Sequence, residues 1–360
     1  MRILWFNWRD IKHPDAGGAE IFTHEIMRRL VKKGYDMTLF SARFLNSLQY
    51  ESIDGINIRR DGGKYTVYCK AKHYYKKYKD IYDIVIDEIN VRPFLTPTFV
   101  KGKPILALVH EVARRALFTQ LHFPLNYIVR YYLVRKWFSY YKDILVLTVS
   151  DSTRRDLQEF GLNKIFLVPQ GLGVTPVCEI TQKESNPTVV FLGRLKRYKL
   201  PDHAIEAFSL VKTAIPDAQM WIIGDGDMYT ELEQLNVKGV TFFGRVDEGL
   251  KYDLLSKAHL ALVPGVQEGW GLVVTECNAM GTPVVAYNVA GLKDSVRDGE
   301  TGILVRDNSP SSLANSAISL LKDRDLLNRY SNNALAFSRQ FSWDKTADVF
   351  DMIVRNAISS

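Results

Sequence analysis

Two carboxylates, Glu268 and Glu276, stand eight positions apart around a glycine-rich turn. The stretch GWGLVVTE that ends at Glu276 is typical of a turn leading into a helix, so the N–H groups of Gly271, Leu272 and Val273 are suited to phosphate oxygens. Carboxylates only accept hydrogen bonds, which suits hydroxyl groups. We therefore predict an anion site here, with Glu268 contacting sugar hydroxyls and Glu276 contacting ribose. Alternatively, the helix dipole alone accounts for Glu276.

A second candidate loop is GRLKRYK, residues 193–199, which follows an apolar run. Its Arg194 supplies a planar fork of donors and its Lys199 a mobile point charge, a combination suited to a diphosphate. The alternative is an ordinary solvated charge run. This loop therefore predicts an anion contact only in combination with the others.

Two further loops of the first half have residues of possible function. Gly17 and Gly18, in HPDAGGAE, close the first strand-to-helix turn, where bare backbone can approach an anion. His110 ends an apolar strand on its carboxyl side, where ligands of parallel sheets bind. The alternatives are a tight turn without a ligand and a structural histidine.

Short apolar runs alternate with amphipathic stretches along the chain, which predicts an α/β fold of parallel sheets with helices on both faces. A Pro- and Gly-containing passage, residues 168–188, interrupts the alternation, so we place a domain boundary there. The predicted domains are residues 1–174 and 175–342, with a C-terminal helix around 343–360 that packs back on the first domain. The runs read as strands are RILWFNW, DMTLFS, DIVIDE, PILALVH, VVFLGRL, AQMWIIG, VTFFGRV, AHLALVPG and TPVVAYN.

Length and composition limit the class of protein. The 360 residues, 46% of them hydrophobic and 24% charged, suffice for two ordinary cores. The sequence contains no run of about 18 apolar residues, so it predicts no membrane span. The first residues, MRILWFNWRD, have charges where a signal peptide needs an apolar core. The three cysteines are far apart and form no metal-ligand pattern. We expect a cytoplasmic protein.

Positive charge is concentrated in the first half. Residues 1–174 contain 28 Lys and Arg against 17 Asp and Glu, a net charge of +11, whereas the remainder contains 19 against 23, a net charge of −4. In residues 64–79 and 126–142 the cations alternate with aromatic residues, which suits an anionic membrane surface. Two other interpretations are a solvated helix whose aromatic rings pack on its own domain, and nucleic-acid binding, which no recognised module supports.

The segment from Glu268 to Glu276 resembles the E-x7-E motif of the retaining glycosyltransferases of family 4, which have the GT-B architecture of two facing Rossmann-like domains. The resemblance covers nearly the whole chain through further motifs in the same order. They are GGAE, VSDSTRRDL, VPQGLG, GRLKRYK, IIGDGD, FFGRV, GTPVVA, AGLKDSVRDGETGILV and FSWDKTADVF.

The resemblance assigns roles to residues on both halves of the chain. It implies that His110 lies near the transferred sugar and Glu268 contacts that sugar, with Arg194 and Lys199 on the diphosphate. The donor-binding residues that it implies are Gly17, Gly18, Gly193, Arg245, Gly271, Leu272, Val273 and Glu276.

Three positions depart from the family pattern. Leu200 and Ala290 stand where glycine is usual, and Gln170 stands where asparagine is usual. All three bear on turn geometry. They therefore affect the expected placement of the loops rather than the expected activity.

The resemblance implies a transfer with retention, by front-face substitution, from a nucleotide-diphosphate sugar to a hydroxyl acceptor, with no metal or other cofactor. We interpret Asp225 and Asp227 of GDGD as a turn rather than a metal site. The basic first half favours a lipid-linked or surface-glycan acceptor and attachment to the inner face of the plasma membrane. A soluble sugar acceptor, a GT-B sugar-nucleotide epimerase and a non-catalytic membrane- or nucleic-acid-binding protein are the alternatives.

Overall fold

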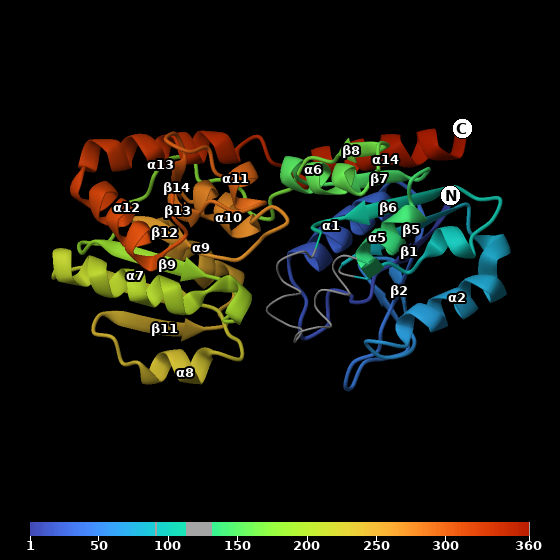
Figure 1. The fold of residues 1–360 in the computed structure, drawn as a ribbon, viewed down its shortest axis with the longest axis horizontal. Coiled ribbons are helices and arrows are strands. Elements are labelled where there is room, and N and C mark those ends of the chain that lie inside the picture. The colour runs from blue at the N-terminus through green and yellow to red at the C-terminus, as the bar shows by residue number, and fades with distance from the viewer. Residues whose placement is uncertain (91, 113–131, 360) are drawn as a thin grey trace. The chain divides into compact units, whose positions relative to one another are not determined.

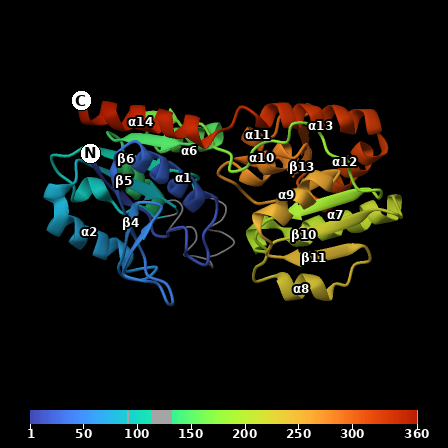
Figure 2. The same cartoon turned by 180° about the vertical axis from the view of Figure 1, so that it is seen from behind.

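The computed structural model describes residues 1–90, 92–112 and 132–359. The chain divides into two units, which Figures 1 and 2 show from opposite sides, and each is described by itself. Unit 1 comprises Met1–Gly171 and Ser342–Ser360, and unit 2 comprises Leu172–Phe341. The division thus follows residue 171, where the sequence suggested residue 174.

Unit 1 is built on an eight-stranded sheet of order β3-β4-β2-β1-β5-β6-β7-β8. Its central strands are nearly continuous apolar runs because both faces are covered, and all six residues of β5 are buried. The strands are β1 (Arg2–Phe6), β2 (Asp36–Ser41), β3 (Tyr50–Ile53), β4 (Ile56–Arg60), β5 (Ile84–Ile89), β6 (Ile105–Val109), β7 (Leu145–Thr148) and β8 (Ile165–Leu167).

One strand of this sheet differs from the prediction of purely parallel pairing. Strand β3 pairs antiparallel with β4 at the edge of the sheet. The two strands are joined by Asp54 and Gly55, whose φ angles of 50° and 79° suit a two-residue hairpin turn. Asp-Gly is a recognised signal for such a turn, so the sequence contained this information.

The C-terminal helix α14 (Trp343–Ser359) returns to unit 1 and packs along α1 (Gly18–Lys32). The ring of Phe350 stacks on that of Trp5 at 5.2 Å between centroids. Arg29 and Lys33 form ion pairs with Asp344 and Asp348 across the helices. The other helices among the described residues of the unit are α2 (Val67–Tyr78), α5 (Val134–Ser139), α6 (Asp151–Glu159), and the short 3₁₀ turns η1 (Lys79–Ile81) and η2 (Thr96–Thr98).

Unit 2 contains a six-stranded parallel sheet of order β11-β10-β9-β12-β13-β14. Its strands are β9 (Thr188–Leu192), β10 (Gln219–Ile223), β11 (Val240–Gly244), β12 (Leu260–Val263), β13 (Val284–Tyr287) and β14 (Gly302–Val305). Its helices are η4 (Arg197–Lys199), α7 (Pro201–Ala214), α8 (Tyr229–Gln234), α9 (Glu248–Lys257), α10 (Leu272–Ala279), α11 (Leu292–Ser295), α12 (Pro310–Lys322) and α13 (Arg324–Ser338).

The basic stretch 64–79 contains all of α2 and the first residue of η1. Tyr75 of this helix is buried, and the ring of Tyr74 packs on Phe40 at 5.0 Å, so part of its aromatic side belongs to the unit's own core. The side chains on the outer face are exposed and include Lys70, Lys72, Lys76, Lys77 and Lys79. Of the second basic stretch, residues 126–131 lie outside the described residues.

The described part of that second stretch contains both buried and exposed aromatic side chains. Phe138 and Tyr141 are buried in the core of unit 1, whereas Tyr132 is 64% exposed.

Among the residues that the structure describes, no helix has both the length and the apolar character needed to cross a bilayer.

Candidate functional site

The strand order of unit 2 determines where a ligand is expected. Strands β9, β10 and β11 follow one another to one side, whereas β12 returns to the other side of β9. Ligands of such doubly wound sheets bind beyond the carboxyl ends of the strands at the point where the order reverses. The loops at this point are residues 193–199 after β9 and 264–271 after β12, and these are the two loops that the sequence singled out.

An ion pair joins these two loops. Lys199 Nζ contacts Glu268 Oε1, and their side chains are only 19% and 15% exposed. Burial lowers the pKa of Lys199, but the neighbouring Glu268 carboxylate outweighs burial and raises the pKa above its ordinary value. Arg194 Nη2 donates to Tyr198 Oη at 2.5 Å, and Lys199 Nζ lies 5.6 Å from the centre of the Tyr198 ring. The predicted cations therefore both lie next to one tyrosine.

Backbone contacts fix the loop that contains Glu268. Val266 N donates to Tyr198 O at 3.0 Å, which ties this loop to residues 193–199. Glu268 N donates to Ala290 O at 3.1 Å. Gly291 has a φ of 81°, and a Cβ atom there would lie 2.1 Å from Glu268 O. Glycine is therefore required at 291, whereas the departure at Ala290 leaves the contact in place.

Helix α10 begins directly after this loop. Gly271 is its N-cap with a φ of 91°, and Leu272 and Val273 are its first two residues. Glu276 is the fifth residue of the helix. Its Oε1 accepts hydrogen bonds from Lys251 Nζ at 2.9 Å and Tyr252 Oη at 3.3 Å, both from α9.

The partners of Glu276 form a partly buried cluster. Burial lowers the pKa of Lys251, but the Glu276 carboxylate outweighs it, so the net shift is upward. Burial raises the pKa of Tyr252 to about 12, with a further contribution from Glu276. Glu276 therefore has specific cationic and phenolic partners, in addition to its place near the helix start.

The remaining predicted residues of unit 2 are spread more widely. Gly193 begins the loop after β9, next to Arg194. Arg245 is exposed and follows the edge strand β11. Strand β10 lies between β11 and β9, so Arg245 is farther from this loop. Asp227 pairs with Lys196 at 3.0 Å, and Asp225 accepts a hydrogen bond from Gly226 N, as in a turn.

Leu200 adopts a left-handed conformation, with φ 52° and ψ 50°, at the N-cap of α7. This is a conformation that glycine adopts without strain. The departure from glycine at this position therefore keeps a glycine-like turn.

In unit 1 the strand order reverses between β1 and β5. The loops that follow these two strands are joined by a hydrogen bond from Asn90 Nδ2 to Asn7 Oδ1 at 3.0 Å. His110 follows β6, the neighbour of β5, and is 8% exposed. Its ring lies edge-on to Phe22 at 5.1 Å. The predicted histidine thus lies at the carboxyl edge of the sheet, next to the reversal point.

Glu88 of β5 is fully buried and was not predicted. Its carboxylate accepts hydrogen bonds from Trp5 Nε1 at 2.8 Å, from Thr23 Oγ1 and from Asn90 Nδ2 at 3.3 Å. His110 Nε2 contacts Glu88 Oε1 at 3.2 Å. Because a carboxylate only accepts, Nε2 is the donor in this contact.

The glycine pair begins α1, but a side chain already occupies part of this turn. Gly17 N donates to Glu20 Oε2 at 2.7 Å, and Arg9 Nε donates to Glu20 Oε1 at 2.9 Å. Burial raises the pKa of Glu20, and the nearby Glu88 adds to this, whereas Arg9 opposes it. Gly18 is exposed as the first residue of α1.

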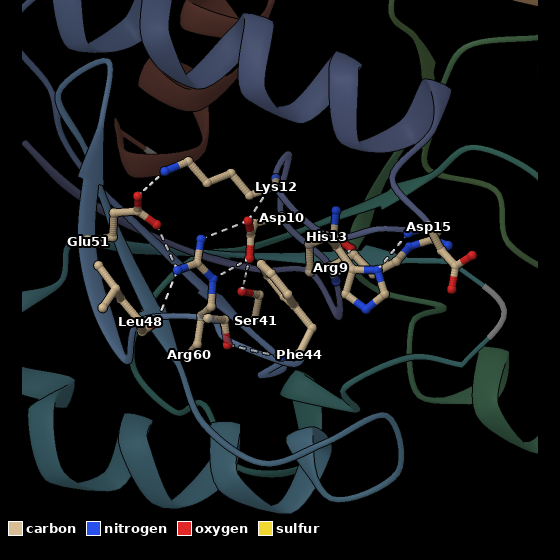
Figure 3. Close-up of polar contacts among 12 residues, drawn as sticks. Arg9, Asp10, Lys12, His13, Asp15, Ser41, Phe44, Leu48, Glu51 and Arg60 are labelled. Carbon is tan, nitrogen blue, oxygen red and sulfur yellow. Dashed lines mark hydrogen bonds and ion pairs between the residues drawn. The ribbon is translucent and has the colours of Figure 1, made fainter. Parts of the chain in front are cut away.

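A buried ion pair anchors the loop between β1 and α1 (Figure 3). Arg60, at the end of β4, donates from Nε to Asp10 Oδ2 at 2.6 Å and from Nη2 to Asp10 Oδ1 at 2.9 Å, and both side chains are fully buried. Ser41 Oγ donates to the same carboxylate at 3.0 Å. Burial raises the pKa of Asp10, but Arg60 outweighs burial and lowers the pKa below its ordinary value.

His13 lies beside this ion pair in Figure 3. Its ring lies edge-on to Trp8 at 5.5 Å and to Phe44 at 5.4 Å, and Asp15 N donates to its Nδ1 at 3.0 Å. Burial lowers the pKa of His13, as does the neighbouring Arg9. The loop therefore presents a fixed group of aromatic and basic side chains at the same edge of the sheet as His110.

Apart from Arg245, the predicted residues thus form two groups, one in each unit. In unit 1 these are the glycine pair and His110, and in unit 2 they are the residues of the loops after β9 and β12 with α10. Lys199 and Glu268 are in direct contact, and Arg194 is linked to them through Tyr198.

Two family models match the chain, one on each half. The model of glycosyltransferase family 4 matches residues 16–174, and the model of glycosyl transferases group 1 matches residues 179–337. The second model includes every predicted site residue of unit 2. The chain belongs to glycosyltransferase family 4.

Curated relatives of this family 4 glycosyltransferase include the D-inositol 3-phosphate glycosyltransferase of Nocardia farcinica, 31% identical over 57% of this chain and 51% of that protein. The phosphatidyl-myo-inositol mannosyltransferase of Mycobacterium leprae is 30% identical over 60% of this chain and 59% of that protein. The chain thus spans about half the length of the curated relatives it matches.

Solved structures share the fold over the whole chain. Sucrose-phosphate synthase of Thermosynechococcus elongatus has a TM-score of 0.82 at 20% identity, and the match covers 99% of each chain. Anabaena HepE, solved in complex with UDP-glucose, has a TM-score of 0.75 at 17% identity and covers 99% of this chain and 100% of its own. The fold is GT-B.

Sequence reasoning missed several polar residues around the candidate site of this glycosyltransferase. Glu88 is preceded by Asp87 in an otherwise apolar run, and a charged residue within a buried strand is itself a signal of a specific partner. Lys251 and Tyr252 lie on α9, whose sequence indicates an ordinary surface helix. Only the folded chain shows that they contact Glu276.

Proposed function

We propose that this family 4 glycosyltransferase transfers a sugar from a nucleotide-diphosphate donor to a hydroxyl acceptor, with retention of the anomeric configuration. The observation that carries the proposal is the contact of Lys199 with Glu268, beside Arg194, where the strand order of unit 2 reverses. Such a point is where a doubly wound sheet binds a nucleotide. The UDP-glucose complex of the neighbour HepE further supports a nucleotide-sugar donor.

Each side chain then has a defined part. The leaving diphosphate gains negative charge as the glycosyl bond breaks, and Arg194 and Lys199 stabilise that charge together with the N–H groups at the start of α10. Glu268 accepts hydrogen bonds from hydroxyls of the transferred sugar, and Glu276 accepts them from ribose. Glu88 holds the ring of His110, which contacts the transferred sugar in this proposal.

The same cations make a metal ion unnecessary for the proposed reaction. Arg194 and Lys199 supply the charge that a divalent cation would otherwise contribute. Within the described ranges, no three or more His, Cys, Asp or Glu side chains gather as a possible metal site. We expect full activity in EDTA. Complete loss in EDTA, with recovery on addition of magnesium or manganese, would contradict this part of the proposal.

We further propose that the acceptor is a lipid-linked or surface-glycan precursor at an anionic membrane. The support is the exposed row of lysines along α2, with Lys76, Lys77 and Lys79 at its C-terminal end. Each such residue near an anionic surface contributes about 1 kcal/mol, and salt screens this attraction.

Liposome flotation tests the membrane attachment. We expect binding that increases with anionic lipid, decreases at high salt and weakens when Lys76, Lys77 and Lys79 are replaced by Glu. Replacement of the exposed Lys238, Lys293 and Lys322 of unit 2 by Glu makes the same charge change and should have little effect. If the wild-type protein stays unbound at low salt on liposomes of strongly anionic lipid, the membrane proposal is dropped and a soluble acceptor is favoured.

A donor assay tests the reaction class. Thermal unfolding with UDP, GDP and ADP should show a rise in melting temperature with one nucleotide, because a ligand that binds only the folded state stabilises it. The matching nucleotide sugars should then be consumed only when an acceptor is present. An epimerised donor that accumulates without acceptor would instead support the sugar-nucleotide epimerase.

A further inference from the structure

Unit 1 contains a cavity of about 340 Å³ along the strands of its sheet. The lining begins at the amino ends of the strands, with Arg2 and Asp36, the first residues of β1 and β2, and Asn57 near the start of β4. It extends along the strands to Arg59, the fourth residue of β4, and to Tyr50 of the edge strand β3. The volume is that of small-ligand sites.

Tyrosine rings form the outer walls of the cavity. Tyr74 and Tyr78, at the end of α2, have ring centroids 4.8 Å apart, and Tyr74 Oη lies 2.7 Å from Tyr82 Oη. On the other side, the guanidinium of Arg59 lies 4.3 Å from the ring centre of Tyr50. Tyr50 is 56% exposed and Tyr78 is 36% exposed. Tyr50 and Tyr78 therefore combine solvent-accessible aromatic surface with hydroxyl groups at the ring edges.

Polar side chains of both hydrogen-bonding types lie beside these rings. Asp36 Oδ1 accepts from Asn57 Nδ2 at 3.1 Å, and Arg2 Nε lies 3.9 Å from Asp36 Oδ2. Arg2 and Asp36 are more than half exposed and so remain open to a ligand. Carboxylates only accept and guanidinium groups only donate, so a ligand here must offer both donors and acceptors.

These features together select one class of ligand. A phosphate would meet the Asp36 carboxylate, and a purely apolar molecule would leave the charges beside the rings without partners. A sugar has hydroxyls that donate and accept, and an apolar C–H face that packs on an aromatic ring. We propose that this cavity is a second, non-catalytic carbohydrate-binding site.

Such a site would hold part of a glycan chain away from the loops proposed for transfer. Binding at a second position raises the effective concentration of a long glycan at the first. This inference goes beyond the proposed transfer reaction and does not depend on it, because it concerns binding in the absence of nucleotide.

A glycan array probed with the labelled wild-type protein, without nucleotide, tests the inference, and the glycan retained most strongly is then titrated in solution. We expect the double variant Tyr50→Ala, Tyr78→Ala to bind it at least tenfold more weakly. Tyr65→Ala removes another exposed tyrosine of unit 1 from outside the cavity and should bind as the wild type does. Thermal unfolding of each variant checks that the fold is kept.

Inorganic phosphate and the variant Asp36→Asn separate a carbohydrate site from an anion site. Glycan binding should be insensitive to phosphate and weaker in Asp36→Asn, whereas an anion site would show competition by phosphate and tighter binding in that variant. The inference is overturned if no glycan is retained, if binding survives the loss of both tyrosines, or if phosphate displaces the glycan. The nucleotide-dependent melting shift is recorded on the same samples, so a failure of the transfer proposal is seen separately.

Discussion

The charged side chains at the carboxyl edges of the two sheets differ in their exposure to solvent. In unit 1 the ion pair of Asp10 and Arg60 is fully buried, and Glu88 is buried among four partners. In unit 2 the pairs Lys199–Glu268 and Lys251–Glu276 have side chains that are 15% to 20% exposed. Water, and therefore a polar ligand, can reach the second set but not the first.

This difference separates residues that shape a site from residues that bind. A buried ion pair is costly to break because the charge that remains is not solvated by water. Such a pair therefore holds a loop in one conformation. A partly exposed pair can exchange its partner for a ligand at lower cost. We therefore expect changes in the buried pairs of unit 1 to alter stability or orientation, and changes in the partly exposed pairs of unit 2 to alter ligand binding.

The largest expected effect is on the stability of unit 1. Arg60→Met leaves the Asp10 carboxylate buried without its cation, which typically costs about 3–5 kcal/mol. Hydrogen-exchange mass spectrometry follows the two units separately and should show the loss in unit 1. The matched control is Lys70→Met, because the Lys70–Asp61 pair is about half exposed. If Arg60→Met lowers the stability of unit 1 no more than Lys70→Met does, burial does not make the Asp10–Arg60 pair more important than an exposed pair.

The next effect is on turnover through the orientation of His110. In Glu88→Gln the shape is kept, but the amide NH₂ donates to Nε2 and so favours the other tautomer of His110. Loss of a carboxylate that orients a histidine costs about 10- to 100-fold in metal sites, and we expect kcat/KM to fall on that scale. The measurement is donor turnover together with the melting temperature.

The neighbouring Asp87→Asn is the control for Glu88→Gln. Among the described residues, Asp87 accepts hydrogen bonds from Tyr141, Thr96 and Phe94 N rather than from His110. This variant should lower the melting temperature more than the turnover, the reverse of Glu88→Gln. If both variants lose activity only in proportion to stability, Glu88 is structural.

The smallest effect concerns a buried ionisable group of unit 2. Burial lowers the pKa of His259 to about 4, and its Nδ1 accepts a hydrogen bond from Thr188 N at 3.0 Å, which a proton would abolish. The unfolded chain binds this proton at higher pH than the folded chain. Stability is therefore complete above the ordinary pKa of about 6.5 and decreases as the pH falls toward 4.

We expect the protonation of His259 to lower the free energy of unfolding by about 1–2 kcal/mol between pH 6.5 and pH 4. The value is small because the side chain is partly exposed. Urea unfolding between pH 7 and pH 4 measures it. His259→Gln should flatten the dependence, whereas His203→Gln, which changes a partly exposed histidine of the same unit, should keep it. An equal pH dependence in all three proteins would contradict the assignment to His259.

Most of the buried strands were predicted from their apolar runs, although β7 and β14 were not. The run DMTLFS is β2, and the run PILALVH contains β6. The hairpin of β3 and β4 was missed although its Asp54-Gly55 turn is a known signal. The reason is that short exposed strands lack the apolar run by which the buried strands were found.

The candidate site was predictable as loops but not as contacts. The loops after β9 and β12 were identified by residue type, since the residues of a loop and its place after an apolar run are local properties of the sequence. The contacts of Glu88 with His110, Arg60 with Asp10 and Lys251 with Glu276 join residues 22, 50 and 25 positions apart. Such pairings depend on sheet order and side-chain packing, which no local pattern contains.

The most direct measurement is calorimetric titration of the nucleotide identified by thermal shift into the wild type, Arg194→Ala and Glu276→Ala. Each variant removes a charged contact that typically contributes about 2–4 kcal/mol, so we expect binding at least 30-fold weaker with an unchanged melting temperature of the free protein. Arg197→Ala changes an exposed cation of the same loop and should bind as the wild type does. Wild-type affinity in Arg194→Ala and Glu276→Ala would contradict the assignment of the donor site to unit 2.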